Sequence, residues 1–492
     1  MEKLCIGWSE KSITPTKKVR LAGQFFERVS ESVETPVTVT AMAVDAGDGQ
    51  MVICSCDLIS ISENLLRLVR ERLAGTPGLL LDKIILNATH THTSLEYDQE
   101  GSMGLSGLDI LKRYLSDEQT YVDKTAGEEV MEAGETMEFL VSRISEAVSE
   151  AWVSRKPAQY ANGFGRAAVG MCRRAVYDDG TAKMWGDTAL ANFQELEGGN
   201  DSGIELLYVF DAEKKLTGIV ANVACPSQVV EHRSYISSDY WGKVKILLRK
   251  HFGEGLFVLG LCSAAGDLAP RDIIRWVEPE SPIDDPNIRR ESPAARIADP
   301  SMFDVKGTWT VGRRIASEII AVYEELGALR KDAELVHEVI PLHLPIRRVT
   351  ITEYQDALHI LHNYLERAGG RSFSFEDQAA MHVYAGTVAR YENQQKQNLH
   401  KIELHVIRFG DIAICTNPFE LFLDYGNQIR ARSKAKQTIL IQLACGSNAY
   451  LPTEKAEHGG HYSAYVSSGI IGHEGGSLLV QTTVETINSL WE

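Results

Sequence analysis

The sequence predicts an α/β fold with mixed α+β character, in which a mixed β-sheet is flanked by helices. Apolar strand-like runs alternate with stretches of helical periodicity along the whole chain. Some neighbouring strands are joined by short turns and others are separated by a helix, so both antiparallel and parallel pairs are expected. Because no proline-, glycine- or charge-rich linker divides the chain, we expect one large domain over residues 1–492.

The first half of the chain begins with a predicted hairpin. Residues 37–44 and 51–59 are strand-like, and the turn between them, Asp45-Ala-Gly-Asp-Gly-Gln50, contains residues that favour chain reversal. Residues 63–74 repeat leucine and valine at helical spacing, and the apolar run Ile84-Ile85-Leu86 then predicts a buried strand. By the same criteria we expect helices over 137–152 and 239–252 and strands over 204–210, 216–224 and 256–261.

The second half opens with a stretch that has no clear periodicity. Residues 271–304 are rich in proline, aspartate and arginine, which predicts a long surface loop in the position of a lid. Beyond it we expect helices over 306–328, 351–366, 375–397 and 476–491, and strands over 401–408, 411–415 and 437–444.

Composition and charge exclude several classes of function. A formal net charge of −17 opposes binding to nucleic acid and docking on anionic membranes. No long uncharged apolar stretch could form a stable membrane insertion, and the N-terminus lacks the apolar core of a signal peptide. Most of the eight cysteines lie in apolar strand-like runs, as reduced cysteines do. We therefore expect a cytoplasmic protein that acts on a small molecule. The sequence is compatible with a monomer and with an oligomer.

A histidine pair follows the strand at residues 84–86. The segment reads Asn87-Ala-Thr-His90-Thr-His92-Thr-Ser94, and on an extended chain residues two apart point to the same side. The small hydroxyl residues around the two rings leave room for a ligand, and imidazole is a common ligand of zinc. The pair predicts half of a metal site; the alternative is two polar residues that happen to end a strand.

Other polar segments also follow apolar strands, where reactive groups tend to gather in such folds. Each has a structural alternative: Glu420 could stabilise a helix N-terminus, Asp267 could cap a turn, and the C-terminal histidines could be loop residues. The segments are 222–240, 265–270, 416–420 and 446–476.

Taken in order, these segments resemble the N-terminal catalytic domain of the neutral/alkaline non-lysosomal ceramidase family. The resemblance spans almost the whole chain, and it depends on the order of the motifs more than on any one of them. We expect no counterpart of that family's C-terminal β-sandwich. The matching motifs are Ile13-Thr-Pro15, Cys56-Asp57-Leu58, Thr89-His-Thr-His92, Gly266-Asp-Leu-Ala-Pro270, Pro418-Phe-Glu420 and Tyr450-Leu-Pro-Thr453.

The resemblance implies a zinc site held by His90, Glu420 and Tyr450. The family's second histidine ligand should follow the strand that ends near Cys225, where this sequence reads Cys225-Pro-Ser-Gln228. His232 is near enough in sequence to take its place, whereas glutamine is a poorer zinc ligand. For the remaining positions the resemblance and the polar segments lead us to expect catalytic roles for His92, Arg173 and Asp267, and substrate contacts from Gln228, Asp239 and His461.

One departure from the family pattern concerns the chemistry directly. The family's catalytic serine corresponds to Ala269, and alanine can neither activate water nor attack a carbonyl. The resemblance still implies a zinc-dependent hydrolase, which we expect to act on an amide bond of a soluble substrate. The alternatives are a non-catalytic metal- or ligand-binding protein on the same fold and a carbohydrate-active enzyme, either a glycosidase or a lyase.

Overall fold

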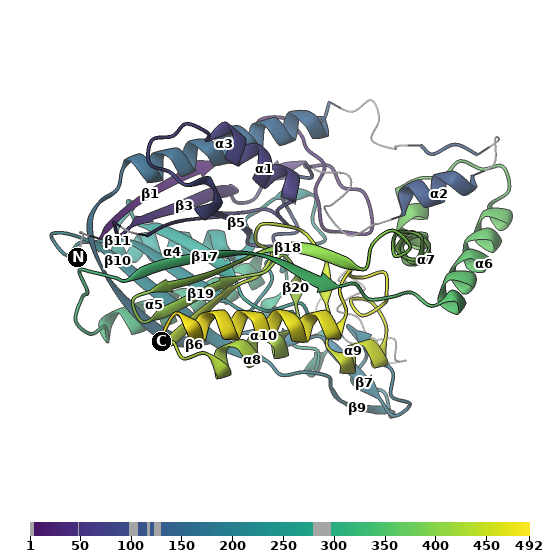
Figure 1. Cartoon of the computed structure of the whole chain (residues 1–492). Coiled ribbons are helices and arrows are strands. Elements are labelled where there is room, and N and C mark those ends of the chain that lie inside the picture. The colour runs from purple at the N-terminus through teal and green to yellow at the C-terminus, as the bar shows by residue number, and fades with distance from the viewer. Residues whose placement is uncertain (1–3, 48, 98–106, 116–118, 123–128, 279–296) are drawn as a thin grey trace.

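Two β-sheets lie face to face, and helices cover their outer faces (Figure 1). The computed structural model describes residues 4–47, 49–97, 107–115, 119–122, 129–278 and 297–492. Both parallel and antiparallel strand pairs occur in each of the two sheets. The predicted α/β fold with mixed sheets is therefore confirmed.

The larger sheet contains strands that are buried on both faces. In the third strand along the chain every residue from Val39 to Val44 is buried. This explains why the sequence of this strand is an almost continuous apolar run and does not alternate between apolar and polar residues. In spatial order the strands of the main path are β13 (Phe257–Cys262), β11 (Leu216–Val223), β10 (Asp201–Asp211), β6 (Lys156–Cys172), β1 (Cys5–Ser12), β3 (Thr38–Asp45), β4 (Gln50–Cys56) and β5 (Ile84–Ala88).

The smaller sheet packs on the larger one through aliphatic and aromatic side chains. Ile407, Phe409 and Ile441 of the smaller sheet belong to the same buried cluster as Val39 and Ile53 of the larger sheet. This shared core fixes the distance between the two layers. The strand order is β17 (Leu335–Pro345), β18 (Leu399–Phe409), β19 (Ile412–Thr416) and β21 (Gln437–Ile441).

The helices on the outer faces follow the predicted apolar periodicity. The first helix starts at Ser62, whose hydroxyl accepts from the Leu65 amide at 3.2 Å, and it buries Leu65, Leu66 and Val69. The covering helices are α1 (Glu63–Arg72) and α3 (Ala133–Val153) on one half of the larger sheet, α4 (Asp239–Phe252) and α5 (Asp304–Glu324) on the other half, and α8 (Leu423–Arg432) and α10 (His473–Ser489) on the smaller sheet.

Three further helices form a separate cluster at one end of the molecule, on the right of Figure 1. They are α2 (Leu108–Tyr114), α6 (Ile351–Ala368) and α7 (Phe375–Asn393), and they share a small core of their own. The remaining short elements are β2 (Ser32–Val33), β7 (Arg174–Tyr177), β8 (Ala182–Met184), β9 (Phe193–Leu196), β12 (Tyr235–Ile236), β14 (Leu268–Ala269), β15 (Trp276–Val277), β16 (Ile297–Ala298), β20 (Glu420–Leu421), β22 (Tyr450–Leu451), α9 (Glu454–Gly459) and two 3₁₀ turns at Leu81–Lys83 and Pro300–Met302.

The stretch predicted as a long loop is partly structured. At its described ends β15 pairs with β16, and α5 begins at Asp304. Residues 279–296, where the predicted lid would lie, are outside the described residues, so the lid stays a prediction. Within the described part of the chain, no helix is both long and apolar enough to cross a bilayer.

Candidate metal and substrate site

The predicted site residues come from loops that follow strands of both sheets. The His-Thr-His segment follows β5, the segment 225–231 follows β11, and Glu420 and Tyr450 lie in the short paired strands β20 and β22. A hydrogen bond of 2.8 Å from the Ser227 hydroxyl to the Thr89 carbonyl joins the first two loops. The first two segments follow strands, as the sequence predicted, whereas Glu420 and Tyr450 lie within short strands.

His90 lies in a strained backbone conformation. The strand ends at Ala88, and His90 has φ +65°, in the left-handed region, where a side chain costs about 1–2 kcal/mol. Its Nδ1 lies 2.7 Å from the Ile59 carbonyl oxygen. Because a carbonyl oxygen only accepts, Nδ1 carries the hydrogen, which leaves Nε2 as the nitrogen that can bind a metal. The ring is therefore prepared as a metal ligand at Nε2.

His92 is held in the same tautomer and faces His90. Its Nδ1 lies 2.7 Å from the Gly23 carbonyl oxygen, and the two Nε2 atoms are 3.4 Å apart. Burial, helped by the neighbouring His90, lowers the pKa of His92 well below its ordinary value, so the ring is neutral. Two lone pairs that face each other repel, and a cation between or beside them removes that repulsion.

Glu420 and Tyr450 lie opposite each other in the parallel pair β20–β22. The Oε2 atom of Glu420 is 3.4 Å from His90 Nε2. Two atoms bound to one zinc ion at about 2.0–2.1 Å and at a tetrahedral angle lie about 3.3 Å apart, so this separation fits a shared zinc ion. The hydroxyl of Tyr450 is 3.1 Å from that of Tyr462, and burial raises the pKa of Tyr450 well above its ordinary value.

The distances from His90 Nε2 to His92 and to Glu420 each fit two ligands of one zinc ion. The ligand atoms of all three residues are not close enough together to form one compact group. Among the histidine, cysteine, aspartate and glutamate side chains of the described residues, the one trio with all ligand atoms within 4.8 Å of one another lies elsewhere. His92 Nε2 and Glu420 Oε2 are thus farther apart than that limit, although each is 3.4 Å from His90. The donor types that fit zinc are the imidazole of His90, the carboxylate of Glu420 and the adjacent phenol of Tyr450.

The loop expected to supply a second histidine supplies a glutamate instead. Glu231 Oε2 is 3.7 Å from His92 Nδ1 and 3.2 Å from Gln24 Nε2, and Glu231 Oε1 is 3.1 Å from Arg271 Nη1. The ring of His232 stacks on Phe303, with centroids 5.0 Å apart, so its assignment as a zinc ligand stays a prediction. Sequence reasoning missed Glu231, whose only signal was its place in a polar segment after a strand.

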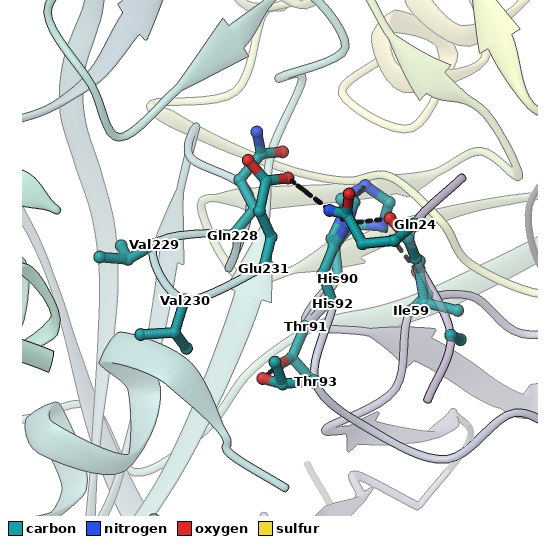
Figure 2. A network of polar contacts seen from close by, with 12 residues as sticks. Gln24, Ile59, His90, Thr91, His92, Thr93, Gln228, Val229, Val230 and Glu231 are labelled. Atoms are coloured by element: carbon teal, nitrogen blue, oxygen red, sulfur yellow. Dashed lines mark hydrogen bonds and ion pairs between the residues drawn. The ribbon is translucent and has the colours of Figure 1, made fainter. Parts of the chain in front are cut away.

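Gln228 contributes an unpaired donor to the site. It is 1% exposed, its Oε1 accepts from Arg173 Nη1 at 3.4 Å, and its Nε2 has no hydrogen-bond partner among the described residues. Figure 2 shows Gln228 and Glu231 on one loop, with the two imidazoles to their right in this view. A buried amide group without a partner is costly unless a ligand satisfies it, which supports the predicted substrate contact.

Arg173 is a buried cation with weakly satisfied donors. Its Nη2 donates to the Gly266 carbonyl at 3.1 Å, but its contact with the Tyr450 hydroxyl is 3.5 Å long. Burial disfavours the charged form, yet Tyr450 and other acidic neighbours raise the pKa of Arg173 above its ordinary value. The guanidinium therefore stays charged and retains donors that a substrate oxygen could use.

Asp267 and Ala269 occupy structural positions beside Arg173. Asp267 accepts from the amide of Leu423, the first residue of α8, at 2.8 Å, and its backbone carbonyl accepts from the Arg173 amide at 3.0 Å. Burial raises the pKa of Asp267 to about 6. Ala269 is fully buried and pairs with Met171 of β6, so no hydroxyl stands at the serine position.

Asp239 and His461 support neighbouring segments. The carboxylate of Asp239 accepts from the Val230 amide at 3.0 Å, which fixes the loop that carries Glu231. His461 Nδ1 accepts from the Met184 amide at 3.1 Å, and burial lowers the pKa of His461. The substrate contacts predicted for these two residues stay predictions.

Replacing Asp239 with asparagine should flatten the dependence of stability on pH. Burial raises the pKa of Asp239 to about 7 from its ordinary 3.8, so the folded protein holds a proton there that the unfolded chain has lost. Stability then falls as pH rises from about 4 to 7, by about 4 kcal/mol from this group. Asparagine cannot ionise and tolerates the φ of +54°. Urea unfolding at several pH values would measure this, and parallel profiles for the two proteins would contradict it.

The comparisons with known proteins agree with this architecture. No protein-family model and no curated protein matches the chain. The crystal structure of neutral ceramidase from Pseudomonas aeruginosa matches 100% of this chain and 75% of its own, with a TM-score of 0.67 and 16% identity. A structure described as ceramidase complexed with C2 matches over the same shares, with a TM-score of 0.67 and 15% identity. The resemblance is thus confirmed for the fold: this chain has a neutral ceramidase-like fold.

Proposed function

We propose that the protein is a zinc-dependent hydrolase that cleaves an amide bond in a small-molecule substrate. The observation that carries this proposal is His90: its Nε2 atom is free to bind a metal and lies 3.4 Å from both His92 and Glu420. The neutral ceramidase-like fold supports the same reaction class.

The residues that would hold zinc are His90, Glu420 and Tyr450. When bound, zinc lowers the pKa of a water ligand and polarises a carbonyl group. Gln228 stands where the family pattern has its second histidine ligand. The coordination positions that the three residues would not fill are therefore open to water or substrate. Gln228 instead presents its Nε2 donor to a ligand.

His92 and Glu231 are suited to move the proton in this reaction. The Nε2 atom of neutral His92 can accept a proton from the attacking water, and the imidazolium so formed is stabilised by the carboxylate of Glu231, 3.7 Å from Nδ1. The same proton is then returned to the leaving nitrogen, which gives a carboxylic acid and an amine. This route needs no nucleophile at Ala269.

Arg173 and Gln228 are placed to bind the carbonyl oxygen while negative charge develops on it. Arg173 is charged and only loosely bonded, and the amide donor of Gln228 is unpaired. Preorganised donors of this kind stabilise an oxyanion without having to reorganise.

The test of the proposal combines metal analysis with an amide panel. The purified protein is freed of metal, reconstituted with zinc, and assayed on fluorescent short-chain ceramide and on smaller N-acyl amines. We expect hydrolysis of at least one amide, loss of activity with a chelator, and recovery with zinc. Zinc binding without any hydrolysis would favour the non-catalytic alternative that Ala269 motivates, and failure to bind zinc at His90 would overturn the proposal.

Replacing Arg173 with methionine should slow the chemical step and leave the zinc content unchanged. Methionine fills a similar volume but provides no donor for the developing oxyanion, so we expect kcat to fall by about 10²–10³-fold. Arg166→Met, at an exposed position of β6, is the matched control. A fall in zinc content with Arg173→Met would instead assign this residue to metal binding.

A further inference from the structure

A second group of metal-ligand side chains lies outside the site described above. Glu403 and His405 are two residues apart on β18 and share one face of the strand, and Cys445 follows β21 with φ +58°. The amide of Cys445 donates to the Leu86 carbonyl of β5 at 2.9 Å. This is the one trio of described histidine, cysteine, aspartate and glutamate residues whose ligand atoms all lie within 4.8 Å of one another. This trio therefore links β18 of the smaller sheet to β5, the edge strand of the larger sheet.

The three polar contacts around His337 and His405 need one more hydrogen than the two neutral rings provide. His337 Nδ1 is 3.1 Å from the Gln50 carbonyl, His337 Nε2 is 2.8 Å from His405 Nδ1, and His405 Nε2 is 2.8 Å from Glu403 Oε1. These three contacts need three hydrogens, but two neutral imidazoles carry only two. The carbonyl and the carboxylate at the ends only accept. One contact must therefore hold an additional cation, which is either a proton or a metal ion.

A metal ion at His405 Nε2 satisfies every member of this network. The Gln50 carbonyl fixes the hydrogen on His337 Nδ1, so His337 Nε2 accepts from His405 Nδ1, and His405 Nε2 is left with a lone pair. A histidine whose other ring nitrogen donates to a fixed acceptor is the usual arrangement of a metal ligand. The lone pair points to where the carboxylate of Glu403 and the sulfur of Cys445 meet.

The distances also fit zinc. Cys445 Sγ is 3.5 Å from His405 Nε2, and ligands bound to zinc at about 2.3 and 2.0–2.1 Å with a tetrahedral angle are about 3.5 Å apart. Glu403 must withdraw by about 0.5 Å to reach the corresponding N–O separation. Its side chain is 29% exposed, which gives a metal ion or a water ligand a way in. Zinc binding would release the proton of the Cys445 thiol, which supplies the thiolate ligand.

We propose that Glu403, His405 and Cys445 form a second zinc site, which clips the smaller sheet to the larger one. A thiolate ligand favours zinc over magnesium or calcium. Arg70 holds both oxygens of Glu403, at 2.7 and 2.9 Å, and so orients the carboxylate toward His405. The proposal does not depend on catalysis at His90, because the two sites share no residue.

Cobalt substitution tests this site because it is the one of the two proposed sites with a sulfur donor. Metal-free full-length protein is titrated with Co²⁺ and followed by absorption. We expect a cobalt–thiolate charge-transfer band in the near ultraviolet that saturates by two equivalents in the wild type, one for each proposed site, and at one equivalent in His90→Ala. The band should disappear in Cys445→Ser and persist in His90→Ala. Cys415→Ser is the matched control, since Cys415 is equally buried on β19 and lies outside the trio.

X-ray absorption on zinc-loaded His90→Ala gives the answer even if Cys445→Ser does not fold. We expect one zinc per chain with one sulfur neighbour at about 2.3 Å. Zinc in this variant without a sulfur neighbour, or a cobalt–thiolate band that survives Cys445→Ser, would overturn the second site. Wild-type protein with one zinc and His90→Ala with none would reject the second site and leave the site at His90 standing. The reverse failure, zinc at Cys445 alone, would leave this proposal standing and reject the proposed function.

Discussion

Replacing His90 with alanine is expected to remove zinc from the candidate site and to abolish hydrolysis. Both close contacts of the site, to His92 and to Glu420, converge on His90 Nε2 at 3.4 Å, so removing this ring breaks both of them. The loss of activity should exceed the roughly 10–100-fold effect of removing a group that only orients a ligand. Zinc per chain, measured by mass spectrometry, and the rate of amide hydrolysis are the two measurements.

The control for this variant is His458→Ala, which changes an exposed histidine on α9. It should keep the wild-type zinc content and the wild-type rate. Zinc in His90→Ala is informative only if it is not bound at the Cys445 site. If this variant still binds zinc and that zinc has no sulfur neighbour, His90 is not a ligand. His232→Ala adds a direct test of the predicted substitute ligand: loss of zinc would confirm His232 as a ligand, and an unchanged zinc content would exclude it.

The part of the site that could be predicted lies within continuous segments. The apolar run before His90 correctly predicted β5, and the two imidazoles, expected on the same side of the chain, lie in contact. The reason for their approach is different, however. An extended chain would align them, but the strand has already ended, and the left-handed φ of His90 turns its ring toward His92. The carbonyls of Ile59 and Gly23, distant in sequence, then fix both rings.

The part that could not be predicted depends on contacts between distant segments. Glu231 reaches His92 because Asp239 and Arg271 hold its loop, and neither contact has a local sequence signal. Strand β6 was missed because Gly163, Gly165 and Gly170 interrupt its apolar pattern, as they would in a loop. In the fold these glycines allow close approach: a side chain at Gly163 would collide with Val322 of α5.

Arg174 illustrates the same limit at a neighbouring position. The sequence indicated a role for Arg173 and none for Arg174, which follows it as the first residue of β7. Arg174 is 0% exposed, and its Nε and Nη2 bind both oxygens of Glu197. It also donates to the carbonyls of Gly460 and Tyr462, at 2.9 and 3.0 Å. It therefore fixes the segment that carries His461 and Tyr462.

Replacing Arg174 with methionine should lower the free energy of unfolding by about 3–5 kcal/mol. The substitution leaves Glu197 as a buried charge without its partner, and that penalty exceeds the loss of the hydrogen bonds themselves. Urea unfolding followed by circular dichroism would measure the change. The control is Lys455→Met, which breaks an exposed ion pair with Glu195 close by and should cost less than about 1 kcal/mol.

The double variant Arg174→Met with Glu197→Leu separates the two contributions to this penalty. If the stranded charge dominates, removing it should restore more than half of the lost stability, because no buried ion is then left unpaired. If the backbone bonds to Gly460 and Tyr462 dominate, the double variant should stay as unstable as Arg174→Met. In that case Tyr462 would also lose its position 3.1 Å from the Tyr450 hydroxyl, and zinc binding would weaken together with stability. Preserved stability in Arg174→Met alone would contradict both explanations.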